Sequence, residues 1–372
     1  MSPSPSRAEE RSPAYGWMRR TIYGGGGTAG AAWRVAAAPL ARLWRATSRL
    51  RLSGRLRPPA DRLPAPTVSV GNVTVGGSGK TSLVRWLVEE GTWEPAVAVL
   101  SRGYGRERKS LRVVPPGGGS ESPREAGDEP LLLARSGAWV GVGPDRVRAA
   151  EAVAERARPA AFLLDDGLQH RRVARCLDLV CFLSEDLVAP ARCLPAGPLR
   201  QGPEWRPPAA AWVVVGGDPR ESAWPEGTIG SAFSPWWREL PGCVAEWDDA
   251  GTVTLSGWTR GREEPFEIST TGAVAIAGVA RPGSVRKFAE RAGWRVARLV
   301  AFPDHHPFGP ADLPPILAEH PGRPILVTEK DAVKLDPAWF GGRGVGVLRR
   351  RLRPRDPELL LGLVAEALGE GR

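Results

Sequence analysis

The chain has 372 residues, of which 42% are hydrophobic and 25% charged. This composition is that of a soluble globular protein and leaves room for two α/β domains. The four cysteines show neither CxxC pairing nor metal-ligand spacing, which argues against a disulfide scaffold or a cysteine metal site. Residues 1–60 hold eleven arginines and two glutamates, so they account for nearly all of the net charge of +10. A nearly neutral body argues against nucleic-acid binding, whereas a single basic arm fits an anionic membrane surface or another anionic partner.

Residues 1–60 form this basic arm. Residues 1–30 are rich in Ser, Pro and Gly, so we expect them to be flexible. Residues 31–51 predict a helix with one basic and one apolar side, which favours a position in the membrane interface. A surface helix packed on the protein body is the alternative, and Pro39 either kinks the helix or starts a second one. The basic side carries Arg34, Arg42, Arg45 and Arg49, and the apolar side carries Trp33, Leu40, Leu43, Trp44 and Leu50.

From residue 67 onward, short β-branched runs alternate with helical stretches such as residues 81–90 and 146–157. This alternation predicts an α/β fold, with a parallel sheet covered on both faces. The predicted strands of this part are residues 67–70, 96–100, 139–142, 161–164, 177–182 and 212–215.

We expect one α/β domain at residues 61–217 and a second, smaller α/β subdomain at residues 271–372. Residues 218–270 break the rhythm with Pro, Gly and Trp, so they predict a linker with a possible hairpin. The second subdomain is predicted to contain strands at residues 273–277, 295–301, 325–328 and 345–348 and a closing helix at residues 358–368.

The strongest chemical signal is the segment GNVTVGGSGKT at residues 71–81, between a predicted strand and a predicted helix. In this context a Gly-rich loop turns its backbone N–H groups toward phosphates, and the helix N-terminus adds positive potential. Lys80 would contact the β- and γ-phosphates of ATP, and the Thr81 hydroxyl would hold Mg²⁺. The P-loop pattern GxxxxGK[ST] has glycine where Thr74 stands. With this motif, the domain at residues 61–217 is expected to be a P-loop NTPase-like kinase domain. The predicted nucleotide-binding residues are Thr74, Val75, Gly76, Gly77, Ser78, Gly79, Lys80 and Thr81.

The second signal is AFLLDDGLQH at residues 161–170, an apolar strand that ends in acidic residues. A P-loop enzyme places its metal-binding carboxylate at such a strand end. Asp165 and Asp166 point to opposite sides of an extended chain, so one can face Mg²⁺ while the other faces a neighbouring loop. Which of the two contacts the metal stays open, and a plain turn is the alternative for the segment as a whole.

Three weaker segments do not decide a function alone. The acids of GDEP at residues 127–130 precede a leucine run and could simply cap a helix. Residues 304–306 (DHH) could be an ordinary loop, and residues 101–105 (SRGYG) are only suggestive.

Together these ordered segments resemble the tetraacyldisaccharide 4'-kinase family, the lipid A 4'-kinases, over about residues 68–335. The likeness also includes PDR at residues 144–146, LPAGP at 194–198, FPDH at 302–305 and TEKDA at 328–332. DDGLQH and TEKDA are specific to that family. One departure is Val285-Arg286, where the family is expected to have two phenylalanines.

The resemblance implies phosphorylation by ATP and Mg²⁺ of the 4'-hydroxyl of a tetraacylated glucosamine disaccharide 1-phosphate. The product would be lipid IVA of lipid A biosynthesis, made at the cytoplasmic face of the inner membrane. Asp128 is implied as the base, supported by His305, while Asp165 and Asp166 serve the metal and the site geometry. The residues implied to line the substrate site are Arg102, Tyr104, Glu129, Arg146 and His170.

This chemistry is physically coherent, because a sugar hydroxyl needs a positioned base at neutral pH. Two alternatives remain at this point. One is a different small-molecule P-loop kinase. The other is a membrane-bound GTPase switch, since residues 328–331 (TEKD) are similar to the guanine-binding [NT]KxD pattern with the lysine one position late.

Overall fold

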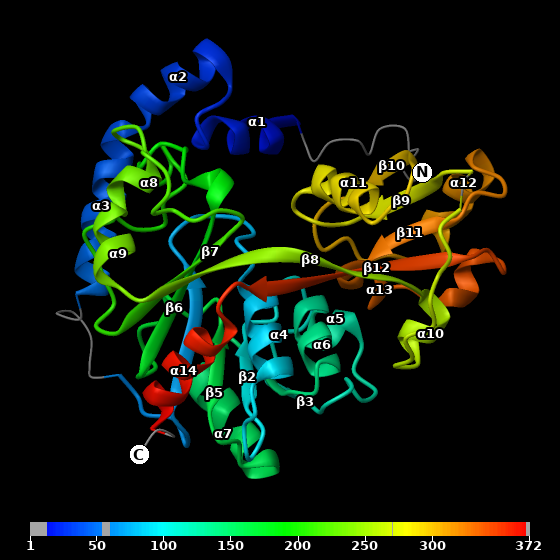
Figure 1. Ribbon diagram of the computed structural model, residues 1–372, viewed down its shortest axis with the longest axis horizontal. Coiled ribbons are helices and arrows are strands. Elements are labelled where there is room, and N and C mark those ends of the chain that lie inside the picture. Colours follow the sequence, from blue (N-terminus) through cyan, green and yellow to red (C-terminus); the bar gives the residue numbers. More distant parts are fainter. Residues whose placement is uncertain (1–12, 54–59, 270, 370–372) are drawn as a thin grey trace.

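The computed structural model describes residues 13–53, 60–269 and 271–369. Its strands form one twelve-stranded sheet in the order β10-β9-β11-β12-β8-β7-β6-β1-β5-β2-β4-β3, with helices packed on the sheet (Figure 1). The predicted α/β class is therefore confirmed.

The first half of the sheet holds the P-loop. It consists of parallel strands, with a short antiparallel strand, β3, at the edge beside β4. All six residues of β1 are buried between β5 and β6, and Val70 of β1 pairs with Asp165 at the end of β5. The strands are β1 (Thr67–Asn72), β2 (Ala98–Ser101), β3 (Arg112–Val114), β4 (Trp139–Val142), β5 (Phe162–Asp165), β6 (Leu177–Leu183) and β7 (Ala210–Val215). The helices are α4 (Lys80–Glu90), α5 (Pro123–Ala126), α6 (Asp128–Arg135), α7 (Arg146–Ala157) and the 3-10 turn η2 (Ser184–Asp186).

The second half is a smaller parallel sheet. Its strands are β9 (Ala273–Ala277), β10 (Val296–Ala301), β11 (Ile325–Thr328) and β12 (Val345–Pro354). Around them lie α11 (Pro282–Arg291), η3 (Pro310–Asp312), α12 (Leu313–Glu319), α13 (Glu329–Ala332) and η4 (Pro337–Phe340). The last helix, α14 (Pro357–Leu368), returns to the first half, where Leu360 and Val364 join the core that contains β1.

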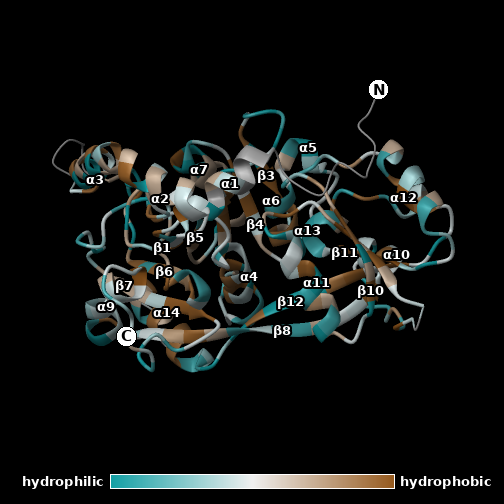
Figure 2. Cartoon of the chain, turned by 90° about the horizontal axis from the view of Figure 1, so that it is seen from above, coloured by the Kyte–Doolittle hydropathy of each residue, from teal (hydrophilic) through white to brown (hydrophobic). Residues whose placement is uncertain are grey.

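A long two-stranded ribbon joins the halves. Strand β8 (Gly242–Thr254) starts parallel to β7 and then runs antiparallel to β12 (Figure 1). The middle of the ribbon is hydrophilic (Figure 2). The segment expected as a linker thus supplies a strand of the sheet, together with α8 (Ile229–Ala232), α9 (Ser234–Glu239) and α10 (Leu255–Thr259). The antiparallel partner of β8 is β12, outside this segment.

The described part of the arm forms three helices: α1 (Pro13–Ile22), α2 (Gly27–Ala36) and α3 (Ala38–Leu52). The expectation of flexibility was wrong for residues 13–30, while residues 1–12 lie outside the described residues. Tertiary contacts override the composition, because Thr21 and Ile22 are buried and Arg34 Nη1 donates to the Thr21 carbonyl at 3.0 Å. Pro39 lies in the first turn of α3, so it starts a second helix and does not kink a single one.

Candidate active site

The P-loop lies between β1 and α4, at the carboxyl end of the parallel strands. Gly76 and Gly79 have φ angles of 103° and 84°, a left-handed conformation that glycine adopts without strain. Ser78 is buried, and within the described residues its Oγ has no hydrogen-bond partner. A buried hydroxyl without a partner beside a helix N-terminus fits a loop that closes around phosphate oxygens.

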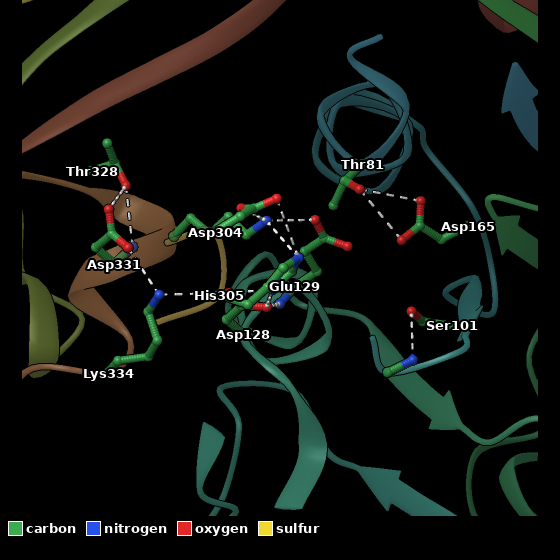
Figure 3. Close-up of polar contacts among 12 residues, drawn as sticks. Thr81, Ser101, Asp128, Glu129, Asp165, Asp304, His305, Thr328, Asp331 and Lys334 are labelled. Atoms are coloured by element: carbon green, nitrogen blue, oxygen red, sulfur yellow. Dashed lines mark hydrogen bonds and ion pairs between the residues drawn. The ribbon is translucent and has the colours of Figure 1, made fainter. Parts of the chain in front are cut away.

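The two aspartates of the second signal take different partners. The Thr81 hydroxyl donates to Asp165 Oδ1 at 3.3 Å and to Oδ2 at 3.4 Å (Figure 3). Asp166 instead accepts from Arg200 Nη1 at 3.0 Å and lies 3.6 Å from Lys80 Nζ. Asp166 also has a φ of 54°, an uncommon conformation for a side chain other than glycine that persists where neighbouring contacts hold it.

Electrostatics separate the same two carboxylates. Burial, followed by the charges of Glu129 and Asp166, raises the pKa of Asp165 to about 7. Burial also acts to raise the pKa of Asp166, but the charges of Lys80 and Arg200 outweigh it and lower this pKa. Asp166 is therefore already paired with cations, whereas Asp165 has the Thr81 hydroxyl as its hydrogen-bond partner and keeps a raised pKa despite the charge of Lys80.

The residues present fit Mg²⁺ bound together with ATP. Among the residues that the structure describes, no group of three or more His, Cys, Asp or Glu side chains is arranged to hold a metal ion. Magnesium on a nucleotide normally needs few protein ligands, because phosphate oxygens and water supply the rest. Thr81 and Asp165 would hold the ion, and Lys80 would contact the phosphates.

The predicted catalytic base, Asp128, and its partner His305 come from different halves of the sheet. Asp128 begins α6, and His305 lies in the loop after β10 with a φ of 61°. His305 Nδ1 is 3.0 Å from both carboxylate oxygens of Asp128, and the Glu129 N–H donates to Asp128 Oδ1 at 2.9 Å (Figure 3). Burial acts to raise the pKa of Asp128, but the His305 hydrogen bond and the nearby Lys330 and Lys334 outweigh it and lower this pKa. Asp128 is therefore ionised at neutral pH.

Two lysines that sequence reasoning did not single out complete this cluster. Lys334 Nζ lies 3.7 Å from Asp128 Oδ2 and 2.8 Å from Asp331 Oδ1, and Lys330 Nζ lies 3.0 Å from Glu129 Oε1. The TEKDA segment indicated their neighbourhood but not their partners. Lys330 is thus bound into an ionic cluster, which is not the arrangement of a guanine-binding lysine.

The remaining predicted substrate residues lie at different depths. Tyr104 is 69% exposed, and its ring centroid is 5.1 Å from that of His305. Arg102 is exposed. Arg146 is buried, donates to the Gly143 carbonyl at 2.7 Å and has its pKa lowered to about 10, first by burial. His170 is half-buried, and burial and then Arg146 lower its pKa to about 4, so it is neutral.

The arm and the 198–204 segment support the P-loop from outside, a connection that the motifs did not indicate. Tyr23 donates its hydroxyl to the Val75 carbonyl, and the Val75 N–H donates to the Pro198 carbonyl. The Arg200 N–H donates to the Val73 carbonyl at 2.7 Å, and Trp44 Nε1 donates to the Arg200 carbonyl at 2.9 Å.

Comparison with known proteins agrees with this geometry. The sequence matches the Tetraacyldisaccharide-1-P 4'-kinase family over residues 33–364. The chain belongs to this family. A Tetraacyldisaccharide 4'-kinase from Anaeromyxobacter dehalogenans is 37% identical over 360 residues, covering 93% of this chain and 91% of that protein. One from Pseudomonas aeruginosa is 37% identical over 289 residues, covering 76% and 77%.

A solved structure of the same family has the same fold. The crystal structure of LpxK from Aquifex aeolicus in complex with ATP matches with a TM-score of 0.70 and 28% identity, covering 90% of this chain and 99% of that chain.

Replacing Lys80 tests the phosphate end of the site. Lys80→Ala removes the cation that would neutralise charge on the transferred phosphoryl group, so we expect kcat to fall at least about 10²-fold with an unchanged melting temperature. Steady-state turnover of ATP with acceptor lipid measures it. Lys287→Ala, which removes an exposed lysine on α11, is the control and should leave kcat unchanged. Near-normal turnover of Lys80→Ala would remove this lysine from the mechanism.

Proposed function

We propose that this chain transfers the γ-phosphate of ATP to the 4'-hydroxyl of a tetraacylated glucosamine disaccharide 1-phosphate, at the cytoplasmic face of the inner membrane. The product is lipid IVA. Family membership supports the reaction, and the observation that carries the mechanism is the Asp128–His305 contact of 3.0 Å between the two halves of the sheet.

The base end of the reaction follows from that contact. Asp128 Oδ takes the proton of the sugar hydroxyl while the sugar oxygen forms its bond to the γ-phosphorus. His305 donates through Nδ1 to the carboxylate and holds its orientation. Because Asp128 and His305 come from different halves, a complete base requires that both halves be in contact.

The phosphate end uses the P-loop. As the bond from the γ-phosphorus to the bridging oxygen breaks, its electron pair goes to ADP, and Lys80 neutralises the charge that collects there. Thr81 and Asp165 would hold Mg²⁺, which would supply further charge neutralisation when bound. Asp166 keeps Lys80 and Arg200 in place through the contacts of 3.6 Å and 3.0 Å.

A double-mutant cycle tests the base. Asp128→Asn and His305→Ala should each lower kcat at least about 10²-fold, and the double variant should be little slower than the worse single one, because groups that act as one unit are not additive. The control is His320→Ala, at the C-terminal end of α12. Losses that multiply in the double variant would show that the two residues act independently, contrary to the proposal.

The arm is the proposed membrane contact. The face of α3 that includes Ala41, Ser48 and Leu52 is buried, whereas Leu40 and Leu43 are 60% and 62% exposed. Of the described helices, none is long and apolar enough to cross a membrane. Helix α3 therefore packs on the body and presents a second, apolar side outward, which suits a helix lying in the interface.

The arginines of α3 divide between these two roles. Arg45 pairs with Glu204 at 2.9 Å on the protein body, whereas Arg42 and Arg49 are exposed beside the apolar side. Cations near an anionic membrane surface contribute about 1 kcal/mol each to binding. Arg42 and Arg49 are therefore the arginines that we assign to lipid headgroups.

Substitution of these two arginines tests the membrane contact. Arg42→Gln with Arg49→Gln should weaken binding to anionic vesicles by about 2 kcal/mol, or roughly 30-fold, and less at high salt. Vesicle co-sedimentation measures it. The charge-matched control is Arg238→Gln with Arg260→Gln, two exposed arginines outside the arm. Equal binding by both double variants would contradict the proposal.

A further inference from the structure

Lys330 lies beside the Asp128–His305 pair. It lies in α13, in the half of the sheet opposite to Asp128 and Glu129. Its Nζ is 3.0 Å from Glu129 Oε1, 3.3 Å from His305 Nε2 and 3.5 Å from Asp304 Oδ1. The ammonium therefore contacts the ring nitrogen of His305 that faces away from Asp128.

These contacts define the protonation of His305. An ionised carboxylate can only accept hydrogen bonds, so the Nδ1 atom at 3.0 Å from Asp128 must carry a proton. Asp304 Oδ2 lies 3.9 Å from Nε2, but Lys330 Nζ is closer, at 3.3 Å. An ammonium can only donate, so a hydrogen bond from Lys330 to Nε2 requires a lone pair on that nitrogen. Both conditions are met only by the neutral imidazole with its proton on Nδ1.

We propose that Lys330 is a positioning residue of the phosphoryl transfer: by donating to Nε2 of His305, it keeps this imidazole neutral and its Nδ1–H directed at Asp128. This role rests on the proposed function, in which Asp128 is the base.

The neutral form matters because of what it does to Asp128. A full positive charge on the imidazole would lower the pKa of Asp128 further and weaken it as a base. A neutral Nδ1–H still orients the carboxylate, but it lowers the pKa of Asp128 less than an imidazolium would. The ammonium of Lys330 opposes protonation of His305, because an imidazolium would place a second positive charge next to the first and like charges repel at this distance.

Lys330 is itself held in the charged form. Burial acts to lower its pKa, but the carboxylates of Glu129, Asp128 and Asp304 outweigh burial and raise this pKa. The donor to Nε2 therefore stays protonated over the whole range in which a histidine titrates. Several ionisable groups face His305 or its two partners: Asp128 and Glu129 on α6, Lys330 on α13, Lys334 just after α13, Asp304 on the same loop as His305, and Tyr104 on the loop after β2.

The kinetic experiment compares the dependence of kcat on pH, at saturating ATP, Mg²⁺ and acceptor, in wild type, Lys330→Met and Lys330→Arg. Loss of the ammonium removes the repulsion that opposes a second ring proton on His305 as the pH falls. We expect Lys330→Met to lose at least about tenfold in kcat between pH 8 and pH 5.5 relative to wild type, while Lys330→Arg keeps the wild-type profile. Lys287→Met, on the exposed face of α11, is the matched control. Parallel profiles for wild type and Lys330→Met would overturn the proposal.

A spectroscopic experiment tests it without any turnover. The chain has only four histidines, so ¹⁵N-histidine labelling with His305→Gln for assignment resolves the ring nitrogens of His305. In wild type at pH 7 we expect a protonated Nδ1 and an unprotonated Nε2. A proton on Nε2, in either the other neutral tautomer or the imidazolium, would overturn the proposal. Absence of phosphoryl transfer in wild type would instead count against the proposed function.

Discussion

One interaction organises the molecule: an ionised Asp128, buried in the first half of the sheet, accepts a hydrogen bond from His305 of the second half. A buried carboxylate is costly unless it is paired and hydrogen-bonded. Here the His305 ring, the Glu129 N–H and Lys334 provide those partners. The same contacts that stabilise the charge also orient the carboxylate, so the proposed base depends on the way the two halves meet.

The short helix α13 connects the two ends of the reaction. Glu329, its first residue, accepts from Arg85 of α4 at 2.9 Å and from Arg351 of β12 at 3.2 Å. Burial acts to raise the pKa of Glu329, but these arginines outweigh it and lower this pKa, so the cluster is ionised. Helix α4 follows directly after the P-loop, whereas Lys330, the next residue of α13, contacts His305. One helical turn thus joins the nucleotide-binding helix to the base.

Much of the framework follows from local sequence. The predicted strand at residues 139–142 and the helix at residues 146–157 coincide with β4 and α7, because buried parallel strands and amphipathic helices leave clear apolar patterns. The adjacency of the P-loop and Asp165 was predictable for the same reason. The P-loop follows β1 and Asp165 is the last residue of β5, and these two parallel strands are neighbours in the sheet. The roles of the individual site residues stay predictions.

Three features were not predictable, each for a physical reason. Strand β8 is half-exposed and polar over its middle, so its residues show neither a continuous apolar run nor a steady alternation. The helix α13 is too short to have a periodicity, and Glu129, one of the partners of Lys330, is 201 positions away in the sequence. Residues 13–30 read as flexible by composition, yet they form helices, and the Tyr23 hydroxyl, within this stretch, donates to the Val75 carbonyl on the body, 52 positions along the chain.

The central claim is that the P-loop and the Asp128–His305 pair act together on a lipid-borne sugar hydroxyl. The most direct measurement is ³¹P NMR of the products that purified protein forms from ATP, Mg²⁺ and a monophosphorylated tetraacyl disaccharide in detergent. The account predicts a new phosphomonoester on the 4'-position in equal amount to ADP, and little ADP without the acceptor. ADP formed at the same rate without acceptor, or no phosphate on the disaccharide, would contradict it.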